Sequence, residues 1–588
     1  MSVPYVLGVS ALFHDSAAAL VRGDEIIAAV QEERLNRKKG DWNLPREAVE
    51  YCLSHLPEGV VLDHVAYYED PRLKLDRMIQ NALENAPYGT LNFAPMLASL
   101  DRMGRELPDW LQSLGAGSSV SVIQHHRAHA ASTFYPSPFE EAAVLVVDGV
   151  GEWSTTTLWK GQGNTLTPLA EIRYPHSLGL FYSAMTQYCG FKVNSGEYKL
   201  MGLAPAGKPR LVDKLLDEVI TLGEDGSFSL NLDYFGFETT PSTMSPRLEA
   251  LLGFGPRFPN EAMTPQHKNL AASAQLIVER AMVGLARAAL AKAGSRNLCL
   301  AGGVALNCVA NAKIFEQVEG LERIFVQPAA GDAGGALGAA LEVSAHLGAP
   351  RPKAHGHRDA MKGAFLGPGY SDAQVEAAIA EAGLDAERYD DADAYADAVC
   401  EELEAGGVVG HFDGRMEFGP RALGNRSILA DPRPPRMMQT VNLRIKFREG
   451  WRPFAPVVLA DHAAELFEGQ IDSPYMLFVA NRRSDDGKSF PAIEHLDGTS
   501  RLQTIEGPGA GRVFALVNRF HERTGCPMLL NTSFNVRGEP IVCTPEDAIR
   551  CFLNTNMDAL AIGSFVLRKR DQGEWVKTYV RKARFDAD

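Results

Sequence analysis

The chain has 588 residues, of which 45% are hydrophobic and 22% charged, and its formal net charge is −15 at pH 7. This length exceeds the roughly 150 residues of a typical domain, so two or more domains are expected. A chain this acidic is a poor candidate for wrapping nucleic acid or coating an anionic membrane. No apolar run approaches the ~18 residues of a membrane span, no cleavable signal segment is visible, and the eight cysteines include no C-x-x-C pair. These features predict a cytoplasmic, enzyme-sized protein without a zinc ribbon or disulfide scaffold.

The first 345 residues alternate short apolar runs, glycine turns and helical stretches, which is the α/β pattern. Expected strands are Val6–Ser10, Ile26–Val30, Ala142–Asp148 and Asn297–Ala301, and a long helix is expected over Asn269–Ala293. Gly348–His357 has the composition of a linker. Beyond it we expect helices Ser371–Ala382 and Ala392–Glu404 and a strand Gly407–Phe412. The pattern predicts an α/β domain over residues 1–355 and a second one over residues 356–588.

Glycine turns follow several of the expected strands of the first domain. They lie at residues 8–10, 148–151, 301–304 and 331–335, and two of them carry an aspartate. Glycine lets a backbone approach a phosphate and present N–H groups at the start of a helix. One such turn is ordinary turn chemistry, but four together favour a nucleotide-type cleft between two lobes.

The segment His125-His126-Arg127-Ala128-His129 is the sharpest local signal. On a helix, His125 and His129 lie on one face and could hold one cation, although such a pair alone can also be a surface or capping feature. Asp148 and Asp332, each expected at the end of a strand, would complete the site. Two imidazoles and two carboxylates suit Fe²⁺, Mn²⁺ or Zn²⁺ better than Mg²⁺. His126 would point elsewhere and serve the structure.

His14 follows the first expected strand. Because the unperturbed pKa of histidine is near neutrality, His14 could act as a general base if it faces the cleft. The alternative is a hydrogen-bonded turn histidine.

Residues 415–452 form a basic segment with a net charge of +6. Its nine basic residues are Arg415, Arg421, Arg426, Arg433, Arg436, Arg444, Lys446, Arg448 and Arg452. A solvated arginine-rich face would interleave acids, which are scarce here, so a polyphosphate site is favoured. Residues 529–535, Leu-Leu-Asn-Thr-Ser-Phe-Asn, leave an apolar strand and end in hydroxyls and amides that complement phosphate and ribose.

Together these motifs resemble the O-carbamoyltransferases of antibiotic and nodulation-factor biosynthesis, and the resemblance runs essentially from end to end. It rests on the His14 segment, residues 125–129, Asp148-Gly149, Ala301–Asn307, Gly331–Gly335, Glu417–Ser427, Lys446, Trp451–Pro456 and Asn531-Thr532-Ser533. The resemblance implies an N-terminal actin-like domain, similar to the tRNA threonylcarbamoyl-transferring domain, and a C-terminal YrdC-like domain.

In this family, carbamoyl phosphate and ATP form carbamoyl adenylate in the YrdC-like site, and the carbamoyl group then passes to a substrate hydroxyl in the actin-like domain. The resemblance implies that His125, His129, Asp148 and Asp332 hold a divalent metal, with Fe²⁺ first and Mn²⁺ or Zn²⁺ as alternatives, and that Mg²⁺ accompanies ATP. It implies His14, Arg421 and Lys446 as catalytic residues. The implied ligand-binding residues are Gly302, Gly303, Asn307, Arg421, Lys446, Arg452, Asn531 and Ser533.

The expected partners are therefore carbamoyl phosphate, ATP and a small-molecule hydroxyl acceptor, with no nucleic acid and no membrane. The acceptor and the oligomeric state cannot be read from the sequence. Two alternatives stay open. One is carbamoylation of a macromolecule, either tRNA or a maturation protein, and the other is an actin-like ATPase without transfer chemistry.

Overall fold

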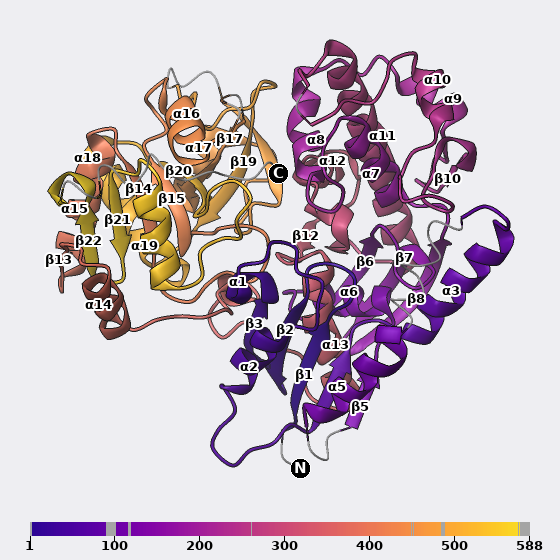
Figure 1. The fold of residues 1–588 in the computed structure, drawn as a ribbon, viewed down its shortest axis with the longest axis horizontal. Helices are drawn as coiled ribbons and strands as arrows, with labels where there is room; N and C mark the ends of the chain where they lie inside the picture. The colour runs from indigo at the N-terminus through magenta and orange to yellow at the C-terminus, as the bar shows by residue number, and fades with distance from the viewer. Residues whose placement is uncertain are drawn as a thin grey trace. The chain divides into compact units, whose positions relative to one another are not determined.

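The computed structural model describes residues 3–89, 101–115, 119–259, 261–448, 450, 452–483, 489–573 and 576. The chain divides into two compact units, each with its own sheets (Figure 1). The first unit comprises Met1–Glu32 and Gly40–Ala360, and the second comprises Glu33–Lys39 and Met361–Asp588. The short segment 33–39 therefore belongs to the second unit, where the guanidinium of Arg37 donates to the carbonyl of Pro540 (2.8 Å).

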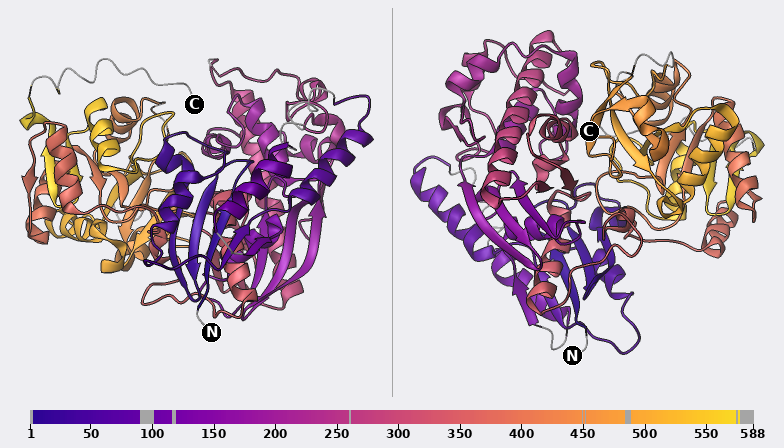
Figure 2. Two further views of the ribbon diagram at one scale, coloured as in Figure 1. Left: turned by 60° about the horizontal axis from the view of Figure 1, so that its bottom comes forward. Right: turned by 180° about the vertical axis from the view of Figure 1, so that it is seen from behind.

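The first unit contains two five-stranded sheets that repeat one topology. Figure 2 shows the ribbon of this unit, coloured from indigo to pink, from two further sides. The first sheet has the order β3 (Glu25–Gln31), β2 (Ala17–Arg22), β1 (Tyr5–Ser10), β4 (His64–Tyr67), β5 (Ser119–Val122). The second has the order β8 (Thr165–Arg173), β7 (Ser154–Gln162), β6 (Glu141–Val147), β11 (Asn297–Ala301), β12 (Arg323–Val326). In each sheet, the first three strands along the chain form an antiparallel meander. The fourth strand then pairs in parallel with the first, and the fifth pairs in parallel with the fourth. This duplicated order confirms an α/β, actin-like first unit.

Small residues let the helices of the first unit approach these sheets closely. Helix α13 (Asp332–His346) packs against α6 (His125–Phe134) and against β1, β2 and β4. A Cβ atom on Gly338 would overlap the carbonyl oxygen of Ala128 in α6, and one on Gly8 would overlap the carbonyl oxygen of Ala336. The glycines therefore permit a backbone approach that brings the N-terminal ends of α13 and α6 together.

The remaining elements of the first unit surround this centre. They are α1 (Glu32–Asn36, which begins in this unit), α2 (Arg46–Leu53), α3 (Pro71–Glu84), α5 (Leu107–Ser113), α7 (Leu178–Tyr188), α8 (Glu197–Leu203), α9 (Val212–Glu218), α10 (Pro246–Leu252), α11 (Pro265–Ala293), α12 (Cys308–Gln317) and the hairpin of β9 (Ile220–Leu222) and β10 (Phe228–Leu230).

The second unit is built on one ten-stranded mixed sheet. Its order is β13 (Glu387–Arg388), β22 (Phe565–Arg568), β21 (Ala559–Ile562), β14 (Val408–Phe412), β15 (Arg426–Ala430), β20 (Met528–Ser533), β16 (Ala455–Leu459), β19 (Thr499–Ile505), β18 (Phe478–Arg482), β17 (Phe467–Glu468). Its helices are α14 (Asp372–Glu381), α15 (Ala392–Glu404), α16 (Met437–Thr440), α17 (Ala460–Leu466), α18 (Arg512–Thr524) and α19 (Pro545–Asn554). The central strands are buried on both faces, so this sheet forms the core of the unit.

Every strand and helix expected from the sequence is present, with ends shifted by a few residues at most. Two placements are wrong. Residues 8–10, expected as a glycine turn, are the last three residues of β1, and Asp332 is the first residue of α13 and not the end of a strand. The glycines that follow it, Gly334 and Gly335, continue the helix. Among the helices in the described part of the chain, none combines the length and apolar composition needed to cross a membrane.

Candidate functional site

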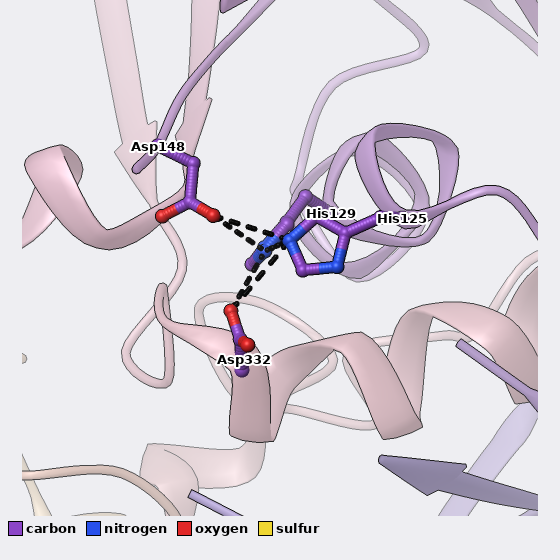
Figure 3. Close-up of side chains that lie close together, drawn as sticks. All are labelled: His125, His129, Asp148 and Asp332. Atoms are coloured by element: carbon purple, nitrogen blue, oxygen red, sulfur yellow. Dashed lines mark hydrogen bonds and ion pairs between the residues drawn. The ribbon is translucent and has the colours of Figure 1, made fainter. Parts of the chain in front are cut away.

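Four buried side chains from three separate segments converge in the first unit (Figure 3). His125 and His129 come from the first two turns of α6, Asp148 follows β6, and Asp332 begins α13. One ligand atom from each residue lies within 4.8 Å of all the others. The structure therefore brings together the four residues whose pattern suggested a metal centre.

The distances within this cluster are those of ligand atoms facing a common point. The Nε2 atoms of His125 and His129 lie 3.1 Å apart, and His125 Nε2 lies 3.1 Å from Asp148 Oδ2. His129 Nε2 lies 3.5 Å from Asp332 Oδ1. Ligands with bonds of about 2.0–2.2 Å to one ion are separated by roughly 3.0–3.5 Å when they are neighbours in the coordination shell. The side chains therefore fit a divalent cation.

The members of the cluster shift one another's pKa values. Burial opposes a charge on His125, but Asp332 and Asp148 raise its pKa to about 9. Burial likewise opposes ionisation of Asp148, but His125 and His129 hold the pKa of that carboxyl well below its usual range. Two buried carboxylates thus require positive charge between them, which either protons or a dication can supply.

The unpartnered atoms support the same interpretation. Among the described residues, Asp332 Oδ1 has no hydrogen-bond donor, although no side-chain atom of Asp332 is exposed. The two facing Nε2 atoms cannot both donate to each other, so at least one presents a lone pair to its neighbour. A cation at their meeting point would satisfy the lone pairs of the imidazoles and of the carboxylates at once. The donor set of two nitrogens and two oxygens suits Fe²⁺, Mn²⁺ or Zn²⁺.

His14 lies beside this cluster, in the loop between β1 and β2. Its Nε2 atom is 3.6 Å from Asp332 Oδ2, and its Nδ1 atom is 3.1 Å from Asp15 Oδ2. Burial opposes a charge on His14, but Asp332, Asp15 and Asp148 raise its pKa to about 10. His126, in contrast, turns away and places Nδ1 3.0 Å from the hydroxyl of Thr157, as expected for a structural histidine.

Two residues that support the cluster were missed in the sequence. The carboxylate of Glu152 accepts hydrogen bonds from the backbone N–H groups of His125 (2.9 Å) and Asp70 (2.7 Å), and so holds the start of α6. The hydroxyl of Tyr68 donates to Asp332 Oδ2 (3.4 Å). Glu152 could have been found, because it ends the same glycine turn that begins with Asp148. Nothing in the sequence distinguishes Tyr68 from other core tyrosines.

The glycine turn after β11 contacts the cluster directly. The N–H of Gly303 donates to Asp148 Oδ1 (2.8 Å), and Gly302 has a positive φ of 90°. Asn307 caps α12 by accepting from the N–H of Ala310 (3.0 Å), and its amide donates to Gln275 (3.0 Å). In this structure, Gly303 therefore orients a carboxylate of the cluster, and Asn307 fixes the helix behind it.

A second set of predicted residues meets in the second unit, around the ammonium group of Lys446. This group contacts the backbone carbonyl of Ser533, the hydroxyl of Ser533 (3.2 Å), and the carbonyl (3.0 Å) and side-chain oxygen (2.9 Å) of Asn535. Burial, with the nearby charges of Arg448 and Arg452, lowers the pKa of Lys446 well below its ordinary value. The four oxygens that contact the Lys446 side chain are therefore all neutral, and none of them belongs to a carboxylate.

The loop that carries Arg421 is held against the same sheet by buried polar groups. One oxygen of Glu417 accepts from the backbone N–H groups of Leu423 (2.7 Å), Asn425 (2.9 Å) and Arg426 (3.2 Å). On β20, the side-chain amide of Asn531 donates to the carbonyl of Ala422 (3.3 Å). The Arg421 loop is thus attached to β20 at Asn531, which lies two residues before Ser533, the residue that contacts Lys446.

The basic segment is not uniformly available to a ligand. Arg426 is fully buried, lies 3.7 Å from the centre of the Phe412 ring and donates to the carbonyls of Asp413 (2.6 Å) and Pro368 (3.1 Å). Arg433 pairs with Asp431 (2.7 Å). These two arginines stabilise the unit itself, so the interpretation of the whole segment as a ligand site is too broad. Trp451, quoted in the sequence motif, lies outside the described residues.

Comparisons with known proteins agree with both units. The family description "Carbamoyltransferase N-terminus" matches residues 5–341, and "Carbamoyltransferase C-terminus" matches residues 400–569. The chain is 45% identical to the uncharacterized protein sll1178 of Synechocystis, over 99% of this chain and 100% of that protein. It is 39% identical to nodulation protein NolNO of Sinorhizobium fredii, over 95% of this chain and 79% of that protein. It is 40% identical to nodulation protein NolO of Bradyrhizobium diazoefficiens, over 76% of this chain and 79% of that protein.

Proposed function

The chain belongs to the carbamoyltransferase family, and we propose that it is an ATP-dependent O-carbamoyltransferase that modifies a hydroxyl of a small natural-product or sugar acceptor. The observation that carries this proposal is the convergence of His125, His129, Asp148 and Asp332 beside His14 in the segment that matches the N-terminal family description. The second, basic site lies in the segment that matches the C-terminal description.

The first half-reaction is assigned to the second unit. Carbamoyl phosphate gives its phosphate to water, and the resulting carbamate attacks the α-phosphorus of ATP, which forms carbamoyl adenylate and releases pyrophosphate. Both reactants are anions, so cations are needed to offset their repulsion. Arg421, Lys446 and Arg452 are the groups assigned to this role, with Asn531 and Ser533 beside them, and Mg²⁺ accompanies the nucleotide.

The transfer step is assigned to the first unit. A divalent ion held by the His–Asp cluster would neutralise its carboxylates and polarise the reacting carbonyl or phosphate. Neutralisation of Asp332 would remove the largest contribution that raises the pKa of His14, and His14 could then accept the proton of the acceptor hydroxyl. The oxygen of that hydroxyl bonds to the carbamoyl carbon, and AMP leaves. Placing both sites in one chain limits hydrolysis of the labile adenylate.

The test supplies the purified chain with carbamoyl phosphate, ATP, Mg²⁺ and a panel of small alcohols, without RNA or partner protein. We expect release of pyrophosphate and AMP and a product whose mass has increased by one carbamoyl group. Consumption of ATP only when RNA or a maturation protein is present would favour carbamoylation of a macromolecule. ATP hydrolysis that ignores carbamoyl phosphate would favour an actin-like ATPase.

A further inference from the structure

Three neighbouring strands of the second unit carry polar side chains in one row. His411 on β14 lies directly opposite Ser427 on β15, and Ser427 lies directly opposite Ser533 on β20. Directly opposed residues of antiparallel strands project from the same face of the sheet, with Cβ atoms about 4.5–5.5 Å apart. Asn531, two residues before Ser533, shares this face. The row therefore ends at Ser533, the residue whose hydroxyl contacts Lys446 (3.2 Å).

Three atoms of these side chains have no hydrogen-bond partner among the described residues, although their residues are 0% exposed. They are the hydroxyl oxygen of Ser427, Nε2 of His411 and Oδ1 of Asn531. His411 uses Nδ1 for the carbonyl of Gly424 (2.6 Å), which makes Nδ1 the donor and leaves Nε2 as an acceptor. Burial lowers the pKa of His411, so the imidazole is neutral at physiological pH and Nε2 keeps its lone pair.

The row is therefore rich in acceptors, whereas the neighbouring site supplies cations. Buried acceptors without a partner are uncommon in folded proteins, and each calls for a missing donor. Carbamoyl phosphate has the matching polarity: its phosphate end takes hydrogen bonds from cations, and its amide end carries two N–H donors. Acetyl phosphate has a methyl group in place of that amide and offers no donor there.

We propose that Ser427, together with His411 and Asn531, receives the amide group of carbamoyl phosphate and makes this chain select carbamoyl phosphate over acyl phosphates that lack an N–H donor. This inference rests on the proposed function of the second unit and adds to it the residues that determine the acyl group. In this arrangement the cations of the basic site bind the phosphate group of carbamoyl phosphate, and the acceptor row accepts hydrogen bonds from its amide group.

The test compares pyrophosphate release from ATP with carbamoyl phosphate and with acetyl phosphate. In Ser427→Ala, we expect the ratio of the two kcat/KM values to fall about tenfold, because a hydroxyl that reads the amide is lost. The matched control is Ser500→Ala on β19. Ser500 is equally buried in the same sheet, but its hydroxyl donates to the carbonyl of Ile493 (2.9 Å), so the ratio should stay at the wild-type value.

A second measurement separates this role from that of a serine that only binds a buried water. The removal of an unpartnered hydroxyl leaves the ligand-free protein at least as stable as wild type, and the increase in Tm produced by carbamoyl phosphate should shrink in Ser427→Ala but not in Ser500→Ala. A wild-type ratio and an unchanged ligand-induced shift in Ser427→Ala would overturn the proposal. Absence of pyrophosphate release from the wild-type protein with carbamoyl phosphate would instead refute the proposed function, and this inference with it.

Discussion

The His–Asp cluster of the first unit and the lysine site of the second surround their buried ionisable groups with different kinds of partner. In the cluster, two imidazoles and two carboxylates face one another, and Asp332 Oδ1 has no hydrogen-bond donor among the described residues. In the second site, four neutral oxygens from Ser533 and Asn535 surround the ammonium group of Lys446. The cluster is built around a point that a cation can fill, whereas in the second site the amino group of Lys446, whose pKa is lowered by burial, already occupies the point on which its oxygen partners converge.

The two units therefore depend on a bound group to different degrees. The charge balance of the cluster changes with whatever lies at its centre, because its pKa values are set by its own members. The lysine site keeps its arrangement through backbone and amide oxygens, which do not titrate. Loss of one member should therefore have a larger effect in the cluster than in the basic site, and the two half-reactions should fail separately.

The largest expected effect follows from removal of a cluster ligand. In His125→Ala, carbamoyl transfer should fall about 10²–10³-fold or more, since the polarising ion is lost, and elemental analysis should show loss of the bound metal. Pyrophosphate release should persist, because the first half-reaction is assigned to the other unit. Loss of both half-reactions together would contradict the separation of the two sites.

The next effect concerns His14, which lies 3.6 Å from Asp332 but is assigned to the acceptor rather than to the ion. In His14→Asn, transfer should slow about 10²-fold, as expected when a general base is lost, while the metal content and pyrophosphate release stay at wild-type values. The measurements are product formation by mass spectrometry and elemental analysis. A fully active variant would exclude His14 as the base.

A smaller effect is expected in the basic site. Arg452→Ala should raise the apparent KM for carbamoyl phosphate or ATP by about 10–100-fold, the range for a charge-assisted hydrogen bond. Arg433→Ala serves as the control, since Arg433 is paired with Asp431 and should leave both KM values unchanged. If the two variants behave alike, the assignment of Arg452 to the ligand fails.

The smallest effect tests how the cluster is supported. Glu152→Ala removes the acceptor for the backbone N–H of His125 and should weaken metal binding about tenfold, within the range found for groups that orient metal ligands. Glu152→Gln keeps a side-chain oxygen and should retain wild-type affinity. Titration of the metal-free protein measures both, and equal affinities in all three proteins would show that Glu152 has no such role.

The fold was largely predictable where burial follows a simple pattern. The apolar run Ala142–Val147 and the helix Ala392–Glu404 are recognisable because one side-chain periodicity dominates each of them. The polar strands β7 and β8 were not predicted, because many of their side chains are threonine or charged residues that also suit loops. Their positions depend on pairing with β6, which is a tertiary effect.

The candidate site was predictable in part for the same reason. The spacing of His125 and His129 indicates a shared helix face, and the structure has that helix. The meeting of this helix with Asp332 depends on the close approach of α13 to α6 at Gly338 and Ala128, more than 200 residues apart in the sequence. No local pattern reports such a contact. Ser427 was named only as part of a motif, since the role proposed for it depends on its strand neighbours.

The assignment of residues 33–39 to the second unit has a consequence for dissecting the protein. A fragment that starts at residue 361 would lack Arg37, which donates to the carbonyls of Pro540 (2.8 Å) and Ile541 (2.5 Å) and lies 3.3 Å from Asp547. Expression of the C-terminal half alone would leave these acceptors without their native donor. Because residues 33–39 of the second unit lie within the N-terminal half of the sequence, dividing the gene at the linker would separate the second unit from this segment.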